Sequence, residues 1–231
     1  MSELSTLLGV DGCRAGWFVI RLRAGNDPAT EALLLKDFAA VLALQPEPCF
    51  VAVDMPIGLL AAAHPGGRSC DQAARALLGP RRSSVFSPPL RGHLQAHAWS
   101  EVSGLSKQSF HLLPKIREVD DCMTPSRQSR VREAHPELAF RNLTGAPMRF
   151  AKRTSEGQQE RLVALEAEIP DARSIYHRAL QQWLRRDVAR DDILDALVLA
   201  VVAKRMANGT AQCVPQRPAH DPRGLRMEIW S

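Results

Sequence analysis

The feature that most constrains the fold is a short apolar segment that ends in an aspartate and a glycine-rich turn, LLGVDGCRAGW at Leu7–Trp17. Residues 7–10 are typical of a buried strand, and WFVIRLR at 17–23 predicts a second strand joined to the first as a hairpin. Asp11 stands where the first strand ends. A carboxylate in such a position needs a metal, a cation or backbone N–H groups as its partner, because unpaired burial of a charge is costly.

A second apolar run, CFVAVDMPIG at 49–58, also ends in an aspartate, Asp54. Its β-branched residues are typical of a strand that is buried on both faces. If the two strands are parallel neighbours, their backbones lie about 4.8 Å apart. Asp11 and Asp54 then meet at the sheet edge where open α/β sheets bind ligands. Alternatively, each aspartate caps a loop or a helix, and the pattern leaves both interpretations open.

The strongest helix signal is ARDDILDALVLAVVAKRMANG at 189–209. Asp191 is predicted to be its N-cap, and Gly209 is predicted to end it. Asp192 and Asp195 are three residues apart and therefore lie on one face of the helix. The rest of the helix is almost wholly apolar, which predicts that it packs against the sheet.

A further strand is predicted around Val131–His135, followed by a helix from Pro136, because proline suits the first helical turn. In an extended segment Glu133, His135 and Glu137 face the same side. The helix dipole favours a first-turn carboxylate such as Glu137, and His135 is typical of a buried structural histidine, but the pattern leaves open whether Glu137 binds metal. Glu133 lies inside the strand and stays a candidate metal ligand.

The remaining elements follow from the same periodicities. We predict a third strand at 31–38, helices at 38–44, 70–79, 154–168 and 172–186, and a final strand or clasp in the tail GLRMEIWS. Ser155 and Gln158 form a capping-box pattern at the start of the helix at 154–168. At 231 residues the chain is predicted to be a single domain, 1–231.

Residues 59–130 differ from the rest, because helical pieces alternate with clusters of Pro, Ser and Arg. This composition predicts a helical and irregular insertion within the domain that covers one side of the sheet. Its cations Arg81, Arg82, Lys107 and Lys115 are candidates for binding the phosphates of a substrate. The alternative is a solvated basic surface.

Together the acids predict a metal site. Carboxylates that lie close together repel one another unless they are protonated or neutralised. A divalent ion neutralises them, and ligands that are all oxygen suit Mg²⁺ or Mn²⁺. Two such ions about 3.5–4 Å apart support phosphodiester cleavage. We therefore expect Asp11, Asp54, Asp192 and Asp195 to be catalytic and to bind the metal, with Glu133 as a fifth metal ligand.

Composition sets limits on compartment and partner. The net charge of +5 permits a polyanionic partner, so nucleic acid of unspecified type is expected. The five cysteines include no CxxC pair, which favours reduced thiols over a zinc site. No signal peptide is apparent, and the longest apolar helical stretch, Ala196–Ala203, is too short to span a bilayer. We expect a cytoplasmic protein with no membrane partner. The sequence is also compatible with a homodimer.

The order of the acids resembles the RNase H-like fold, and within it the RuvC-type resolvases. There an acid on strand one, an acid on strand four and a DxxD pair on the last helix build the metal site. The resemblance implies that Asp11 and Asp54 take the strand positions and that Asp192 and Asp195, in DDILDAL, take the helical pair. RuvC-type enzymes usually have glutamate at the second position, so Asp54 departs from the pattern with a shorter side chain.

More closely, the chain resembles the family called domain of unknown function 429, described as predicted RNase H-fold nucleases. The matching stretches are VDGCRAGW, VDMPIGL, RRSSVFSPP, GLSKQSFHLLPKIREVD, EAHPELAF and DDILDAL. The resemblance implies an α/β fold with an RNase H-like mixed sheet, hairpin-connected first strands, then parallel strands, flanked by helices. It also implies a metal-dependent nuclease, a hydrolase that acts on phosphodiester bonds with Mg²⁺ or Mn²⁺. It does not supply a substrate.

Two alternatives stay open. The first is a nucleotide-binding phosphotransferase of the actin and sugar-kinase type, in which the turn DGCRAG would hold phosphates through backbone N–H groups. Cys13 and Arg14 stand where that phosphate loop usually has hydroxyl residues, which argues against it. The second is a non-catalytic nucleic-acid-binding protein that keeps the fold without turnover.

Overall fold

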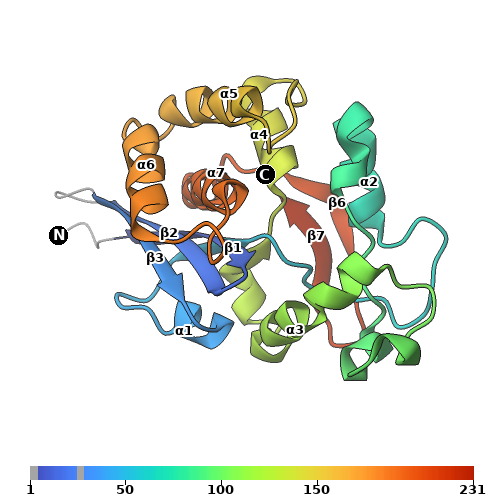
Figure 1. Ribbon diagram of the computed structural model, residues 1–231. Coiled ribbons are helices and arrows are strands. Elements are labelled where there is room, and N and C mark those ends of the chain that lie inside the picture. The colour runs from blue at the N-terminus through green and yellow to red at the C-terminus, as the bar shows by residue number, and fades with distance from the viewer. Residues whose placement is uncertain (1–4, 25–28) are drawn as a thin grey trace.

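The computed structural model describes residues 5–24 and 29–231, and its centre is a mixed five-stranded sheet with the order β3-β2-β1-β4-β5. The strands are β1 (Ser5–Cys13), β2 (Gly16–Ala24), β3 (Ala29–Leu35), β4 (Phe50–Val53) and β5 (Val131–Glu133). β1, β2 and β3 pair antiparallel, whereas β4 and β5 run parallel to β1. Helices flank this sheet (Figure 1). The predicted α/β fold class is confirmed, and the arrangement is consistent with an RNase H-like fold.

The glycine-rich stretch after β1 is a tight hairpin turn, as predicted. Cys13 pairs with Gly16, so the turn leaves little open backbone. A Cβ at Gly16, where φ is +146°, would lie 2.1 Å from the carbonyl oxygen of Leu35, so this position requires glycine. The N–H of Ala15 donates to the carbonyl of Asp187 at 3.2 Å, which fixes the turn to the segment before the last helix.

The two strands that end in aspartate are parallel neighbours. Val10 of β1 is in register with Val53 of β4, and the N–H of Asp54 continues the ladder by donating to the Val10 carbonyl at 3.0 Å. Asp11 and Asp54 each follow a residue of this pair, so both lie at the same edge of the sheet. The prediction that these two strands are parallel neighbours is therefore confirmed.

The helices form a layer on each face of the sheet. They are α1 (Phe38–Leu42), α2 (Ser69–Leu78), α3 (Lys107–Cys122), α4 (Pro136–Thr144), α5 (Ser155–Glu166), α6 (Ala172–Gln182) and α7 (Arg190–Ala207). α7 packs on one face with α5 and α6 outside it, and α1 and α3 cover the other face (Figure 1). α7 is buried continuously from Ile193 to Ala203, as its apolar composition predicts.

The contact between α7 and β1 is unusually close at Gly9. A Cβ on Gly9 would lie 2.0 Å from the backbone nitrogen of Ala200 and 2.2 Å from the carbonyl oxygen of Ala196. The helix backbone therefore rests on the strand backbone, at a distance that only glycine permits. This contact brings the N-terminal half of α7 over the end of β1.

The C-terminal part of the chain adds a second sheet, formed by β6 (Cys213–His220) and β7 (Arg226–Trp230). The final strand is confirmed in β7, whereas β6 is not anticipated by the sequence pattern. A bridge from Ala134 to Trp230 joins this hairpin to the end of β5. Residues 59–130 contain α2, α3 and short 3-10 helices, and their status as an insertion within one domain stays a prediction.

Two local predictions at element ends need correction. The third strand stops at Leu35, and Phe38 already begins α1, because the Asp37 carboxylate accepts the Ala40 N–H and caps that helix. At α5 the N-cap is Thr154, whose hydroxyl accepts the Gly157 N–H at 3.1 Å. The predicted N-cap Ser155 is therefore wrong by one residue, and the predicted capping box does not form, because the third helical position is Gly157.

No helix among residues 5–24 and 29–231 is both long and apolar enough to cross a membrane. All five cysteines are free thiols, in agreement with their scattered positions in the sequence.

Candidate functional site

Four aspartates from three elements converge at the C-terminal edge of the sheet. Asp11 comes from the end of β1, Asp54 from the residue after β4, and Asp192 and Asp195 from the first turns of α7. We call these four residues the acid cluster. Each of the other three carboxylates raises the pKa of Asp11, which shows that they are close enough to repel it.

The α7 pair is placed by the start of that helix. The N-cap is Ala189 and not the predicted Asp191. Asp192 instead accepts the Ala189 N–H at 2.7 Å, the interaction of a third-position acid in a capping box. Asp195 lies one turn further in and is only 3% exposed. Asp192 therefore has a structural role in capping the helix, whereas Asp195 accepts no hydrogen bond from the described backbone.

The acids of the cluster are harder to ionise than free aspartates. Burial, followed by the neighbouring Asp54, Asp195 and Asp192, raises the pKa of Asp11 well above its usual value. Burial and then Asp195 raise the pKa of Asp54 to about 7. Burial raises the pKa of Asp192 to about 6. Within the described chain, no hydrogen-bond donor reaches the carboxylate of Asp11 or Asp54 to offset this cost.

One cation lies against the acid cluster. The Lys152 ammonium is 2.7 Å from a carboxylate oxygen of Asp195 and 3.4 Å from one of Asp191. Burial acts against its charge, but Asp195, Asp11 and Asp191 outweigh burial and raise the pKa of Lys152 above its usual value. The lysine in turn lowers the pKa of Asp11 and Asp54. Lys152 is therefore a built-in counter-ion for the cluster.

The segment that carries Lys152 is held firmly between α4 and α5. The Glu160 carboxylate accepts the N–H groups of Arg149 and Phe150 at 2.9 and 3.1 Å. Arg81 donates to the carbonyls of Met148, at 2.9 Å, and Phe150. Arg81, predicted to bind substrate, thus binds the backbone next to Lys152 and positions the counter-ion.

The cluster has more negative than positive charge. Four carboxylates, with Asp191 beside them, face the single ammonium of Lys152 among the neighbours that shift their pKa values. In the described part of the chain, no group of three or more His, Cys, Asp or Glu side chains is arranged to hold a metal ion as it stands. The donor chemistry nevertheless fits a hard divalent cation, because every available ligand is a carboxylate oxygen.

Glu133 does not share this environment, which argues against the metal-ligand role predicted for it. Both of its oxygens accept hydrogen bonds from Arg68, at 2.6 and 2.8 Å, and one also accepts the Ile57 N–H at 2.7 Å. Arg68 binds Asp71 as well, at 2.7 and 3.0 Å. The Arg68 side chain is 2% exposed, so Arg68, Asp71 and Glu133 form a buried ion triad, named so below.

Glu137 and His135 have structural partners that the sequence pattern anticipates only in part. Glu137 binds Arg161, and it contributes to raising the pKa of Asp195, so it lies beside the acid cluster. Its second oxygen is buried without a partner among the described residues. His135 is the N-cap of α4 and accepts the Leu138 N–H, in agreement with a structural role.

The remaining predicted substrate-binding cations lie in different surroundings. Lys115 donates to the Gly16 carbonyl at 2.7 Å and lies 4.6 Å from the centre of the Trp17 ring, so it supports the β1–β2 hairpin. Lys107 is exposed at the first residue of α3. Arg82 is exposed on the 3-10 helix Gly79–Ser84 and lines a cavity, as described below.

Sequence reasoning missed Lys152 and the partner of Glu133. Lys152 stands in the loop APMRFAKRTS and carries no local signal beyond its charge. Arg68 directly precedes α2, where its sequence neighbours suggest no buried partner. Both roles depend on tertiary contacts with residues far away in the chain.

Comparison with known proteins identifies the family and leaves the activity open. No curated protein and no solved structure matches the chain. A family model described as protein of unknown function (DUF429) matches residues 9–220, which include every member of the acid cluster together with Lys152. The chain therefore belongs to this family, DUF429.

Proposed function

We propose that the protein is a metal-dependent phosphodiesterase, a nuclease in which the acid cluster binds Mg²⁺ or Mn²⁺. The observation that carries the proposal is the convergence of four carboxylates at one sheet edge, where Asp11 and Asp54 have raised pKa values and accept no hydrogen bond from the described residues. Such an arrangement costs stability unless a cation neutralises it, and its retention is typical of functional sites.

The chain's own residues have distinct roles in this proposal. Asp11, Asp54, Asp192 and Asp195 would hold the metal. When bound, the ion would activate a water and stabilise the charge that develops on the phosphate. Lys152 orients Asp195, and an ammonium has more N–H donors than its two carboxylate contacts use. A remaining donor of Lys152 is available for a phosphate oxygen.

The hairpin geometry favours this proposal over a phosphotransferase. A phosphate loop needs several backbone N–H groups that point into an open turn. Here Cys13 and Gly16 pair directly, and the Ala15 N–H is already bound to Asp187. The turn after Asp11 therefore offers little backbone for a triphosphate.

Cleavage assays on the full-length protein test the proposal. The substrates are duplex DNA, an RNA–DNA hybrid, a branched junction and single strands, each with Mn²⁺ or Mg²⁺ and with EDTA. We expect metal-dependent cleavage that falls by about 100-fold or more in Asp11→Asn and in Asp195→Asn, because both would lose a metal ligand. Product ends identified by mass spectrometry give the bond that is broken.

The matched control is Asp171→Asn, which removes an exposed carboxylate whose side chain makes no capping hydrogen bond at α6. This variant should cleave as the unaltered protein does. Cleavage that persists at full rate in Asp11→Asn and Asp195→Asn would refute the proposal. So would the absence of cleavage on every substrate and of any Mn²⁺-dependent change in melting temperature.

A further inference from the structure

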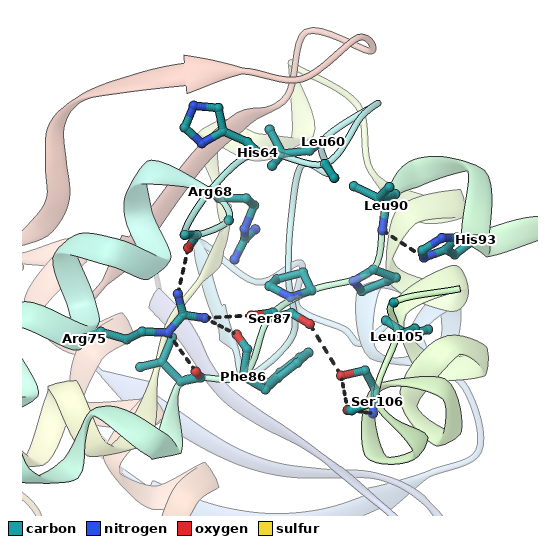
Figure 2. Close-up of a pocket in the computed structure, with 18 of the residues that line it drawn as sticks. Leu60, His64, Arg68, Arg75, Phe86, Ser87, Leu90, His93, Leu105 and Ser106 are labelled. Carbon is teal, nitrogen blue, oxygen red and sulfur yellow. Dashed lines mark hydrogen bonds between the residues drawn. The ribbon is translucent and has the colours of Figure 1, made fainter. Parts of the chain in front are cut away.

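A large cavity lies in the region between α2 and α3. Its volume is about 790 Å³, within the range of roughly 300–1,000 Å³ that is usual for small-molecule sites. Its walls come from the turn before α2, from the segment 82–90 and from the start of α3 (Figure 2). The function proposed above assigns no role to this space.

The charge of the cavity wall is positive. Its lining contains arginines, histidines and several serines, and no aspartate or glutamate. Arg68 is neutralised within the buried ion triad, but Arg75 binds only uncharged oxygens. Arg82 is exposed and forms no ion pair with the acids of the described chain. Two arginines that line this space therefore have no carboxylate partner among the described residues.

Arg75 holds two walls of the cavity in a fixed position relative to each other. Its guanidinium donates to the carbonyls of Gly66, Val85 and Phe86 at 2.9, 3.1 and 3.1 Å, and to the Ser87 hydroxyl at 3.1 Å (Figure 2). These bonds tie the turn before α2 to the segment that follows the 3-10 helix. Two walls of the cavity are thus fixed to each other by one side chain.

Part of the lining is apolar. Leu60, Phe86, Pro88, Leu90 and Leu105 contribute to it, and the apolar portion adjoins the serine hydroxyls. A lining that combines arginines without carboxylate partners, a phenylalanine and prolines suits a ligand with both an anionic group and a flat apolar part. A free inorganic anion would leave most of this volume and its apolar surface unused.

The large cavity shares part of its wall with a smaller cavity that reaches the acid cluster. A smaller cavity of about 20 Å³ is lined by Asp54 and shares Arg68, Val85, Phe86 and Pro88 with the large one. A ligand in the large cavity therefore lies one wall of side chains away from Asp54.

We propose that this cavity binds a single phosphorylated nucleoside unit, with its phosphate toward Arg82 and its base against the apolar wall. The role of this ligand as a substrate or product rests on the proposed phosphodiesterase function, but its binding to the cavity requires no metal. The unit is either a free mononucleotide or the 5′-phosphorylated end of a single strand. Both share the chemistry of one phosphate beside one base.

Equilibrium binding to the full-length protein in EDTA tests the inference without cleavage. The probes are a nucleoside 5′-monophosphate, the same nucleoside without phosphate, and a short single strand with or without a 5′-phosphate. We expect the phosphate to strengthen binding by about tenfold or more, which corresponds to one charge-assisted contact. Arg82→Glu should weaken binding of the phosphorylated probes by at least about tenfold.

Arg178→Glu is the matched control, because it makes the same change of charge at an exposed residue on α6, on the opposite side of the molecule (Figure 1). It should bind all probes as the unaltered protein does. Chemical shift changes at Gly66, Gly67 and Gly104, whose residues line the cavity, give a second measurement that does not depend on a variant.

The outcomes separate this inference from the proposed function. Binding of the monophosphate alone identifies a free nucleotide as ligand, and stronger binding of the phosphorylated strand identifies a strand end. Equal effects of Arg82→Glu and Arg178→Glu, or no binding of any phosphorylated probe, would overturn the inference even if nucleic acid is cleaved. Phosphate-dependent binding without cleavage on any substrate would support the cavity and count against the phosphodiesterase.

Discussion

The acid cluster and the buried ion triad are neighbouring groups of buried charge with opposite degrees of compensation. In the triad, Arg68 gives hydrogen bonds to both carboxylates, and Glu133 also accepts a backbone N–H. In the acid cluster, Asp11 and Asp54 accept no hydrogen bond within the described chain. Asp11 and Glu133 are both buried and differ in the supply of donors, whereas Asp192 and Asp195 of the cluster accept hydrogen bonds from Ala189 and Lys152.

This difference distinguishes a structural role from a functional one. Glu133 on the edge strand β5 and Asp11 on the central strand β1 are both buried acids, 5% and 8% exposed, so burial alone does not tell them apart. A carboxylate whose oxygens are all engaged is stable as it stands, whereas one that lacks donors needs a ligand from outside. Four experiments test this contrast.

The largest effect is expected when the triad loses its cation. Arg68→Met leaves Glu133 and Asp71 buried without a partner, which should lower the free energy of unfolding by about 3–5 kcal/mol. Urea denaturation at pH 7 measures it. Arg178→Met, at an exposed site on α6, should stay within about 0.5 kcal/mol. A loss below 1 kcal/mol in Arg68→Met would show that the buried ion triad does not stabilise the fold.

The next experiment makes the same kind of change in both groups. Glu133→Gln should destabilise the protein, because it breaks the pair with Arg68. Asp11→Asn should stabilise the metal-free protein at pH 8, because it removes a buried charge whose pKa is raised. Unfolding in urea with EDTA gives both values. Shifts of the same sign in the two variants would remove the contrast between the groups.

A smaller effect is expected from pH. The folded-state pKa values of Asp54 and Asp192, about 7 and about 6, lie above the ordinary value of 3.8. The folded protein therefore binds more protons than the unfolded chain between about pH 4 and 7. The free energy of unfolding in EDTA should fall as the pH rises through this window.

Saturating Mg²⁺ or Mn²⁺ should flatten that dependence, since the ion takes the place of the protons. Asp54→Asn should reduce the slope in EDTA. The same pH dependence in Asp54→Asn as in the unaltered protein would contradict the raised pKa of Asp54.

The smallest effect is expected from the counter-ion. Lys152→Met removes the ammonium from Asp195, but the Lys152 side chain is 39% exposed, so water screens much of the loss. We expect a decrease of about 1 kcal/mol or less in EDTA, and a larger increase of melting temperature on adding Mn²⁺ than in the unaltered protein. A weaker response to Mn²⁺ would mean that Lys152 helps to bind the ion and does not compete with it.

Strand periodicity predicted the positions of the aspartates well, because their placement follows from short-range rules. Asp11 and Asp54 end apolar runs, and the parallel pairing of β1 with β4 needs only that these strands be neighbours. The i, i+3 spacing on α7 placed Asp192 and Asp195 on one face in the same way. Whether these acids bind metal stays a prediction.

The missed features depend on contacts that sequence periodicity does not carry. β6 contains Pro215 and Pro218, and prolines argue against a strand in any pattern-based prediction. Glu133 was placed correctly on a strand, but its partner Arg68 lies 65 residues away. Lys152 reaches the acid cluster only because Arg81 and Glu160 fix the loop before α5.

The close contact at Gly9 has a consequence for how the site can be lost. Residue 9 carries no functional group, yet the smallest side chain there would collide with the backbone of α7 at Ala196, the residue next to Asp195. Gly9→Ala would push α7, with Asp192 and Asp195, away from β1, which carries Asp11, while all four acids stayed in the sequence. A sequence survey that checked only for the four acids would still count such a chain as having the site. The distance between the acids of the sheet and those of α7 would nevertheless have changed.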